Sequence, residues 1–384
     1  MQEAEGLARL GLKYNPFPPA STGVAHVNDL WIPDAWQQDL RARYKDLQTG
    51  QGDRALPIVG EYGSGKTYLL RWMGETLFEP SNIRHFAFDN PGVAFYDLAN
   101  RLLRQVGRYE LSKALWEVVS LRQTHTTQPR LVDFTFPEWL SSIRQPSAKA
   151  DAIGQLRGQI LGLELTTDEE IAHKVALMVA ETGSRPYFEY RDFVAGKAGA
   201  LVAEREEAPY FRTLIRILLL VNSADGIAFL IDEFEDVALQ RRLTKKQSFE
   251  YLATLRRLLD VSAELPLWLV VSMTPEAFAQ TTSLDPSLAE RFAPEYRIPP
   301  LTQSEAYGMV RHRVGEARIQ SREGIFPFEE GMIEELRLST SSKARPLIKV
   351  LFQAVASASS RGMSPPIPTE LVREAEETVY PVAK

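Results

Sequence analysis

An eight-residue stretch carries the clearest chemical pattern in this chain. Residues 60–67 read G-E-Y-G-S-G-K-T and fit the phosphate-binding pattern G-x-x-x-x-G-K-[ST] at every required position. Glycines let the backbone curl so that its N–H groups face phosphate oxygens. Lys66 would then reach the β- and γ-phosphates, and the Thr67 hydroxyl would bind Mg²⁺. The pattern therefore predicts a nucleotide site.

The segments on either side of this loop suit the same chemistry. The apolar run A-L-P-I-V precedes it as a short buried strand, and T-Y-L-L-R-W-M-G-E-T-L follows with helical spacing. Phosphate would lie at the N-terminus of that helix, where the dipole and the free N–H groups favour anions. The residues expected to surround the nucleotide here are Gly60, Glu61, Tyr62, Gly63, Ser64, Gly65, Lys66, Thr67 and Tyr68.

A pair of acids follows a second apolar strand, residues 227–231. Asp232 and Glu233 would lie at the carboxyl edge of the sheet, where ligands bind in such folds. We expect Asp232 to hold Mg²⁺ through the ion's waters, and Glu233 to orient and deprotonate the attacking water. Many strands end in an acidic turn, so this pattern gains its meaning from the phosphate loop upstream. Glu235 and Asp236 are expected to be solvated acids at the start of a helix.

A third strand, residues 267–271, is followed by S-M-T-P. Thr274 suits a helix N-cap with Pro275 at the first helical position. Ser272 is the better candidate for a residue that senses the γ-phosphate or positions the water.

Continuous apolar strands that alternate with helices predict an α/β fold with a parallel sheet covered on both faces. The expected strands are 56–59, 83–88, 227–231 and 267–271, and the expected helices are 33–47, 93–106, 210–221, 245–259, 304–317, 329–337, 345–357 and 369–379. The predicted domains are a nucleotide core over 56–106 and 210–300, joined by an N-terminal extended segment and helix over 1–55, with a helical insertion over 107–209 and an all-helical lid over 301–384.

Composition limits the classes of protein that this chain could be. The 384 residues are 44% hydrophobic and 24% charged, with a net charge of −6, so no overall basic character points to nucleic acid. The absence of cysteine excludes disulfides and thiol catalysis and is compatible with a cytoplasmic location. Neither a signal peptide nor a membrane span is expected from the pattern of apolar residues.

Several motifs together resemble the AAA+ ATPase superfamily. They are, in order, G-E-Y-G-S-G-K-T, L-I-D-E, V-V-S-M-T, L-A-E-R-F, I-P-P-L-T and S-K-A-R-P. The arrangement is similar to the origin-recognition branch and its bacterial relatives, including transposition regulators and phage-defence ATP-binding proteins of the BREX type. The first two motifs are specific to P-loop NTPases at large, and the later ones gain weight from their order.

The resemblance implies roles for two arginines. Arg291, in L-A-E-R-F, matches the arginine finger that enters a neighbouring subunit's site, with Arg297 as the second choice. The alternative for Arg291 is a surface cation paired with Glu290 or Glu295. Arg345 matches the second sensor arginine of the lid, and the alternative is a lid-surface cation. Asn90 matches a polar residue that restrains the catalytic glutamate, or it is a turn residue before a proline.

The chain departs from the family pattern in its large insertion and in the little sequence that follows the third lid helix. Direct sequence-specific DNA binding is therefore not expected. A basic cluster, Arg241, Arg242, Lys245, Lys246, Arg256 and Arg257, could contact duplex DNA through its backbone, or could be a solvated helix face. Aromatic residues of the insertion, Trp116, Trp139, Tyr187, Phe188 and Tyr190, could form a surface for a protein partner or fill the insertion's own core.

These patterns predict an ATPase that binds and hydrolyses Mg-ATP at a subunit interface. Its expected role is a nucleotide-dependent switch for assembly of a homo-oligomer on DNA or on a partner protein, in a DNA transaction or in phage defence. The alternative is a nucleotide-gated scaffold of a defence complex, with little turnover and no direct contact with nucleic acid.

Overall fold

The computed structural model describes residues 2–18, 31–49, 54–89, 92, 95–121, 134–182, 207–239 and 243–381. Its centre is a sheet in which every strand pairing is parallel, with the strand order β2-β3-β4-β1-β5. The strands are β1 Ala55–Val59, β2 Ile83–Phe88, β3 Gly226–Ile231, β4 Leu267–Met273 and β5 Tyr296–Arg297. The expected α/β class with a parallel sheet is therefore confirmed.

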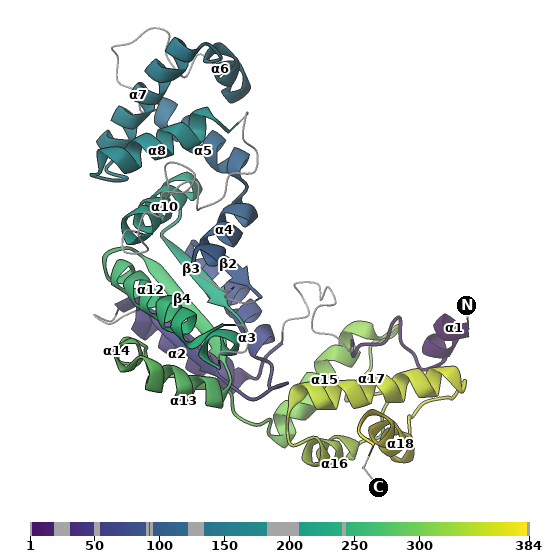
Figure 1. The fold of residues 1–384 in the computed structure, drawn as a ribbon. Helices are drawn as coiled ribbons and strands as arrows, with labels where there is room; N and C mark the ends of the chain where they lie inside the picture. Colours follow the sequence, from purple (N-terminus) through teal and green to yellow (C-terminus); the bar gives the residue numbers. More distant parts are fainter. Residues whose placement is uncertain are drawn as a thin grey trace.

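Helices surround the sheet and extend from it in two directions (Figure 1). Those near the sheet are α2 Asp34–Thr49, α3 Lys66–Met73, α4 Phe95–Val106, α10 Glu207–Asn222, α11 Glu235–Ala238, α12 Lys245–Glu264, α13 Pro275–Leu284 and α14 Pro286–Ala289. The inserted helices are α5 Arg108–Leu121, α6 Phe136–Ser142, α7 Pro146–Gly162 and α8 Glu169–Ala180. The remaining ones are α1 Gln2–Arg9, α15 Gln303–Ala317, α16 Met332–Ser339, α17 Ala344–Ser360 and α18 Thr369–Val379. No helix among these described segments is long and apolar enough to cross a membrane.

The central strands are apolar along their whole length because both of their faces are buried. In β3, Phe229 and Ile231 belong to one hydrophobic core, whereas Ala228 and Leu230 belong to the other. This division follows the two-residue period of side chains in a strand. The first core includes residues of α4, α10 and α12, and the second includes residues of α2 and α3. A strand that is covered on both faces cannot show the alternating pattern of an exposed sheet.

The described inserted helices share the first core with α4 and α10. Trp116, Phe136 and Trp139 lie in this core, with ring centroids 5.5–5.8 Å apart. The interpretation of Trp116 and Trp139 as core residues is therefore confirmed. Tyr187, Phe188 and Tyr190 lie outside the described residues.

Residues 2–18 contact the C-terminal helices rather than the sheet. A Cβ atom at Gly6 would lie 2.3 Å from the backbone oxygen of Ser359 in α17, so only glycine allows α1 to approach this closely. Phe17 is fully buried in the core that α15 to α18 share with α2 and α3. Within the N-terminal segment 1–55, α1 thus lies beside α17, whereas α2 lies beside the sheet (Figure 1). Neither α1 nor β5 was among the elements expected from the sequence.

A π-helical turn, Gly74–Phe78, continues α3 and makes room for a side chain of β2. A Cβ atom at Gly74 would lie 2.9 Å from the His85 ring, so the imidazole occupies that space. His85 Nδ1 lies 3.7 Å from the carboxylate of Glu79, and the His85 side chain is 21% exposed. Burial lowers the pKa of His85 below its ordinary value, and the opposing effect of Glu79 is smaller.

We predict that His85 makes the fold less stable in mild acid. As the pH falls through the ordinary histidine range, the unfolded chain binds more protons than the folded chain, so the free energy of unfolding declines. His85→Gln removes this contribution. Denaturant unfolding of both proteins at about pH 7.5 and about pH 5.5 measures it, and the wild type should lose more stability. An equal loss in the two proteins would contradict the assignment.

Candidate nucleotide site

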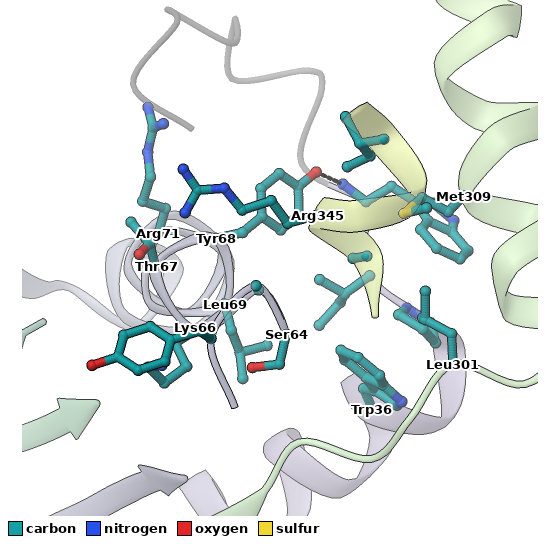
Figure 2. A pocket seen from close by; sticks show the side chains of 18 of the residues that line it. Trp36, Ser64, Lys66, Thr67, Tyr68, Leu69, Arg71, Leu301, Met309 and Arg345 are labelled. Atoms are coloured by element: carbon teal, nitrogen blue, oxygen red, sulfur yellow. Dashed lines mark hydrogen bonds between the residues drawn. The ribbon is translucent and has the colours of Figure 1, made fainter. Parts of the chain in front are cut away.

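One pocket brings together the phosphate loop, the acids after β3 and the C-terminal helices (Figure 2). Its lining from the loop and α3 includes Tyr62, Gly63, Ser64, Gly65, Lys66, Thr67, Tyr68, Leu69 and Arg71. Asp232, Glu233 and Glu235 line it after β3, and Arg345 lines it from α17. The structure thus gathers around one cavity residues that are up to 330 positions apart in the chain, from Pro18 to Ile348.

The loop is curled as its glycines allow. Gly63 and Gly65 have φ angles of 79° and 102°, a region that other residues rarely adopt. The N–H of Gly60 donates to the carbonyl of Met273 over 3.1 Å, which joins the start of the loop to the end of β4. Because α3 begins directly at Lys66, the first N–H groups of this helix face the loop and can receive an anion.

The Lys66 ammonium lies inside the curl of the loop. It donates to the Gly60 carbonyl over 3.0 Å and lies 5.2 Å from the centre of the Tyr62 ring. Lys66 is 8% exposed, whereas Tyr62 is 54% exposed, so the ring partly covers the ammonium on the solvent side. This arrangement holds a positive charge next to the helix N-terminus, which suits a phosphate group.

Asp232 is the meeting point of three segments. One of its carboxylate oxygens accepts a hydrogen bond from the Thr67 hydroxyl of α3. The other oxygen accepts from the Ser272 hydroxyl of β4 and from the N–H of Glu233, the latter over 3.0 Å. A hydroxyl and a carboxylate in contact are oxygen ligands of the kind that Mg²⁺ prefers, with phosphate oxygens and water completing its octahedron. The residues present therefore fit the expected ion.

Ser272 was expected to sense the γ-phosphate or to position the attacking water. The side chain is fully buried at the end of β4 and does not line the pocket. Its hydroxyl is used by Asp232 instead. Thr274, by contrast, caps α13 as predicted, because its side chain accepts from the N–H of Ala277.

Glu233 and Glu235 both line the pocket but differ in environment. Glu233 is exposed and has a φ angle of 51°, an uncommon backbone region for a residue with a side chain. Glu235 is 3% exposed, and its Oε2 atom has no hydrogen-bond partner. Burial raises the pKa of Glu235 above its ordinary value; Lys66 opposes this effect, and Asp232 and Glu233 add to it. The expectation of a solvated Glu235 is wrong.

The lid contacts the phosphate loop through the backbone. The N–H of Arg345 donates to the carbonyl of Gly63 over 3.0 Å, and a Cβ atom at Gly63 would lie 3.1 Å from the Arg345 Cβ. Figure 2 shows the Arg345 side chain on the side of the pocket that α3 forms, near Tyr68 and Arg71. Arg345 is therefore placed where a guanidinium could meet a phosphate of the same subunit.

Arg291 lies away from this pocket. Its guanidinium forms an ion pair with Asp260 of α12 and donates to the Arg256 carbonyl over 3.2 Å. Neither Glu290 nor Glu295, the partners considered from the sequence, is the one it uses. The structure therefore does not bring Arg291 to the site of its own chain.

Other predicted cations, like Arg291, pair with nearby residues of their own chain. Arg297 is exposed in β5 and pairs with Glu295 at 3.0 Å. In the basic cluster, Lys246 pairs with Glu250 at 3.5 Å, and Arg256 donates to Ser287 over 2.7 Å. These pairs favour the interpretation of a solvated helix face. Asn90, Arg241, Arg242 and the Arg257 side chain lie outside the described residues.

An apolar wall of the pocket was not predicted. It comes from residues before and within α2 and from the lid, namely Trp31, Ile32, Trp36, Leu301, Met309 and Ile348. Aromatic and apolar side chains at one end of a charged site suit a flat heterocycle, such as the base of a nucleotide. Trp36 belongs to the helix expected over 33–47, and nothing in the local pattern showed which residues it would contact.

Comparisons with known proteins find a distant curated relative and similar solved structures. No family model matches the chain. One curated relative, an uncharacterized HTH-type transcriptional regulator of Methanocaldococcus jannaschii, is 25% identical over 165 residues, or 43% of this chain and 38% of that protein. The match thus spans about two fifths of each protein.

Two solved structures of the Aeropyrum pernix ORC2 protein are similar in overall arrangement. The ADP form has a TM-score of 0.47 at 14% identity, over 90% of this chain and 70% of that one. The ADPNP-ADP complexes have a TM-score of 0.48 at 15% identity, over 92% and 71%. The class itself, a P-loop α/β fold with helical regions, rests on this chain's own sheet and loop.

We predict that Ser272→Ala destabilises the fold by about 1.5–3 kcal/mol, the usual range for a hydrogen bond to a charged group. The matched control is Ser248→Ala, an equally buried hydroxyl that donates to the neutral carbonyl of Val237 over 3.0 Å. That change should cost only about 0.5–1.5 kcal/mol. Chemical denaturation measures both, and a smaller loss at Ser272 than at Ser248 would contradict a positioning role.

Proposed function

We propose that this chain binds and hydrolyses Mg-ATP and acts as a nucleotide-dependent assembly switch. The observation that carries the proposal is the convergence of Lys66, the Thr67–Asp232 contact and Arg345 on one pocket. An anion site, a pair of oxygen ligands and a cation from the lid are parts that phosphoryl transfer to water uses. The apolar wall beside them supports a nucleotide rather than a bare phosphate.

Each residue has a role that follows from its position. Lys66 and the N–H groups of the loop and of α3 would bind the β- and γ-phosphates. Thr67 and Asp232 would hold Mg²⁺, which neutralises charge on the phosphate oxygens. Glu233, at the exposed edge of the site, would orient the attacking water and accept its proton. Arg345 would report the γ-phosphate to the lid through its backbone contact with Gly63.

The proposed domains follow the same division as the expectation from the sequence. Residues 56–106 and 210–300 would form the nucleotide core, 107–209 the insertion and 301–384 the lid. The packing of residues 2–18 on the C-terminal helices supports one change, which is to count this segment with the lid.

We propose contact between subunits because the Arg291 side chain, in its observed position, does not line the pocket of its own chain. Its side chain is 32% exposed and is held by Asp260 on α12. A guanidinium in this position would stabilise the transferring phosphoryl group of a neighbouring copy. A homo-oligomer would then complete each site, and ATP would favour its assembly on a partner. The process that this assembly would serve is a DNA transaction or phage defence. If the partner is a protein, the insertion is the surface proposed to bind it.

We predict that Glu233→Gln keeps nucleotide binding and reduces turnover by at least about 100-fold, because a positioned general base contributes about 10²–10⁴-fold. Equilibrium binding of a fluorescent ATP analogue and release of phosphate measure the two properties. Asp236→Asn, three residues farther along and outside the pocket lining, is the control and should behave as the wild type. Equal turnover in wild type and Glu233→Gln would refute the hydrolysis mechanism. Binding with no turnover in the wild type would instead favour the nucleotide-gated scaffold.

We predict that Arg291→Ala binds ATP normally but loses turnover by about 10³-fold or more, the usual effect of a missing arginine finger. Lys66→Ala should lose ATP binding and turnover, but this variant still carries Arg291. Mixing these two inactive variants should restore activity, because the finger of one completes the intact site of the other. A mixture that stays inactive, or an Arg291→Ala protein that turns over alone, would contradict action between subunits.

A further inference from the structure

Glu235 is a buried carboxyl group that the mechanism above does not use. It is the first residue of α11, is 3% exposed, and lines the same pocket as Lys66 and Asp232. Its Oε2 atom has no hydrogen-bond partner. An unsatisfied polar atom in such a place costs about 1–3 kcal/mol, and more if it carries charge. We therefore expect the Oε2 atom of Glu235 to accept a hydrogen bond when a ligand occupies the site.

Asp232 has little acceptor capacity left for this purpose. A carboxylate offers about four acceptor positions, and Thr67, Ser272 and the N–H of Glu233 use three of those on Asp232. One position therefore remains for a metal ion. Mg²⁺ keeps several of its waters when it binds to protein, and these waters must donate hydrogen bonds to something. The Oε2 atom of Glu235 is a buried carboxylate acceptor of the pocket that has no hydrogen-bond partner, so it has that capacity.

Lys66 does not already satisfy Glu235. Its ammonium donates to the carbonyls of Gly60 over 3.0 Å and Glu61 over 3.5 Å, and it lies 5.2 Å from the centre of the Tyr62 ring. Lys66 therefore acts on Glu235 through its charge and not through a direct hydrogen bond.

Glu235 is also not placed to be a direct ligand together with the neighbouring acids. Over the part of the chain that the structure describes, no three Asp, Glu or His side chains come close enough to hold a metal ion. Because Mg²⁺ keeps several of its waters in protein sites, we place the contact of Glu235 with an ion at Thr67 and Asp232 through water. Such outer partners orient the waters of a metal and change its affinity by about 10–100-fold.

We propose that Glu235 is a positioning residue that accepts hydrogen bonds from the waters of the Mg²⁺ ion bound with the nucleotide. This inference rests on the proposed function of the same pocket. It assigns separate tasks to the three acids after β3: Asp232 holds the ion, Glu233 acts on the attacking water, and Glu235 holds the ion's water shell. The buried place of Glu235 suits that task, because a charge acts more strongly on its neighbours where bulk water is excluded.

The experiment measures binding of a slowly hydrolysed ATP analogue while Mg²⁺ is varied, first in wild type and then in Glu235→Gln. The two side chains have nearly the same shape, and Gln needs no desolvation of a charge, so the variant should fold. Without Mg²⁺, the variant should bind the analogue as tightly as the wild type or more tightly, because a negative charge near the phosphates is gone. The Mg²⁺ concentration for half-maximal binding should rise about 10–100-fold.

Two further variants complete the experiment. Asp236→Asn makes the same change of charge one residue away, outside the pocket lining, and should leave the Mg²⁺ titration unchanged. Glu235→Asp keeps the carboxylate on a shorter side chain and should give an intermediate midpoint, which also tests the proposal should the Gln variant fail to fold.

The outcomes separate this inference from the proposed function. An unchanged Mg²⁺ midpoint in Glu235→Gln, or an equal loss of binding with and without Mg²⁺, would overturn the role of Glu235 alone. A wild-type protein that binds no nucleotide with Mg²⁺ present would overturn the proposed function and this inference together.

Discussion

The contact of Asp232 with Thr67 and Ser272 is the interaction on which the arrangement of the site depends. It joins the first turn of α3 to the ends of β3 and β4. Along the chain, Asp232 lies 165 positions after Thr67 and 40 positions before Ser272. A buried carboxylate with three donors is stable only when all three segments are in place. The same contact therefore ties the phosphate loop to the sheet and sets out two oxygen ligands for a metal.

Around this contact, the site is divided between two bodies of the structure. The charged part comes from the sheet and α3, whereas the apolar wall and Arg345 come largely from the C-terminal helices and from residues before α2. The hydrogen bond between Arg345 and Gly63 is a direct link between them. Residues 2–18 pack on the same lid helices, and α1 lies beside α17 (Figure 1), so both ends of the chain contribute to the element that supplies Arg345.

The fold was largely predictable because its signals are local. Apolar runs of five to seven residues mark β1, β3 and β4, and Thr274 followed by Pro275 marks the start of α13. The helix α1 was not predictable in this way, since its close approach to α17 depends on Gly6 facing Ser359. The strand β5 has two residues, and only its pairing with β1 defines it. Such elements exist because of distant partners, which a local pattern does not contain.

By itself, the sequence determined the loop at 60–67 and the acids after β3, because the chemistry of phosphate binding needs those residue types at neighbouring positions. Only the tertiary structure decided how each acid is used. Glu235 looks like a solvated helix-start residue in the sequence, yet it is buried in the pocket, and Ser272 serves Asp232 instead of the cavity. Burial is set by what packs against a residue from elsewhere in the chain, and burial is what separates a surface charge from a site residue.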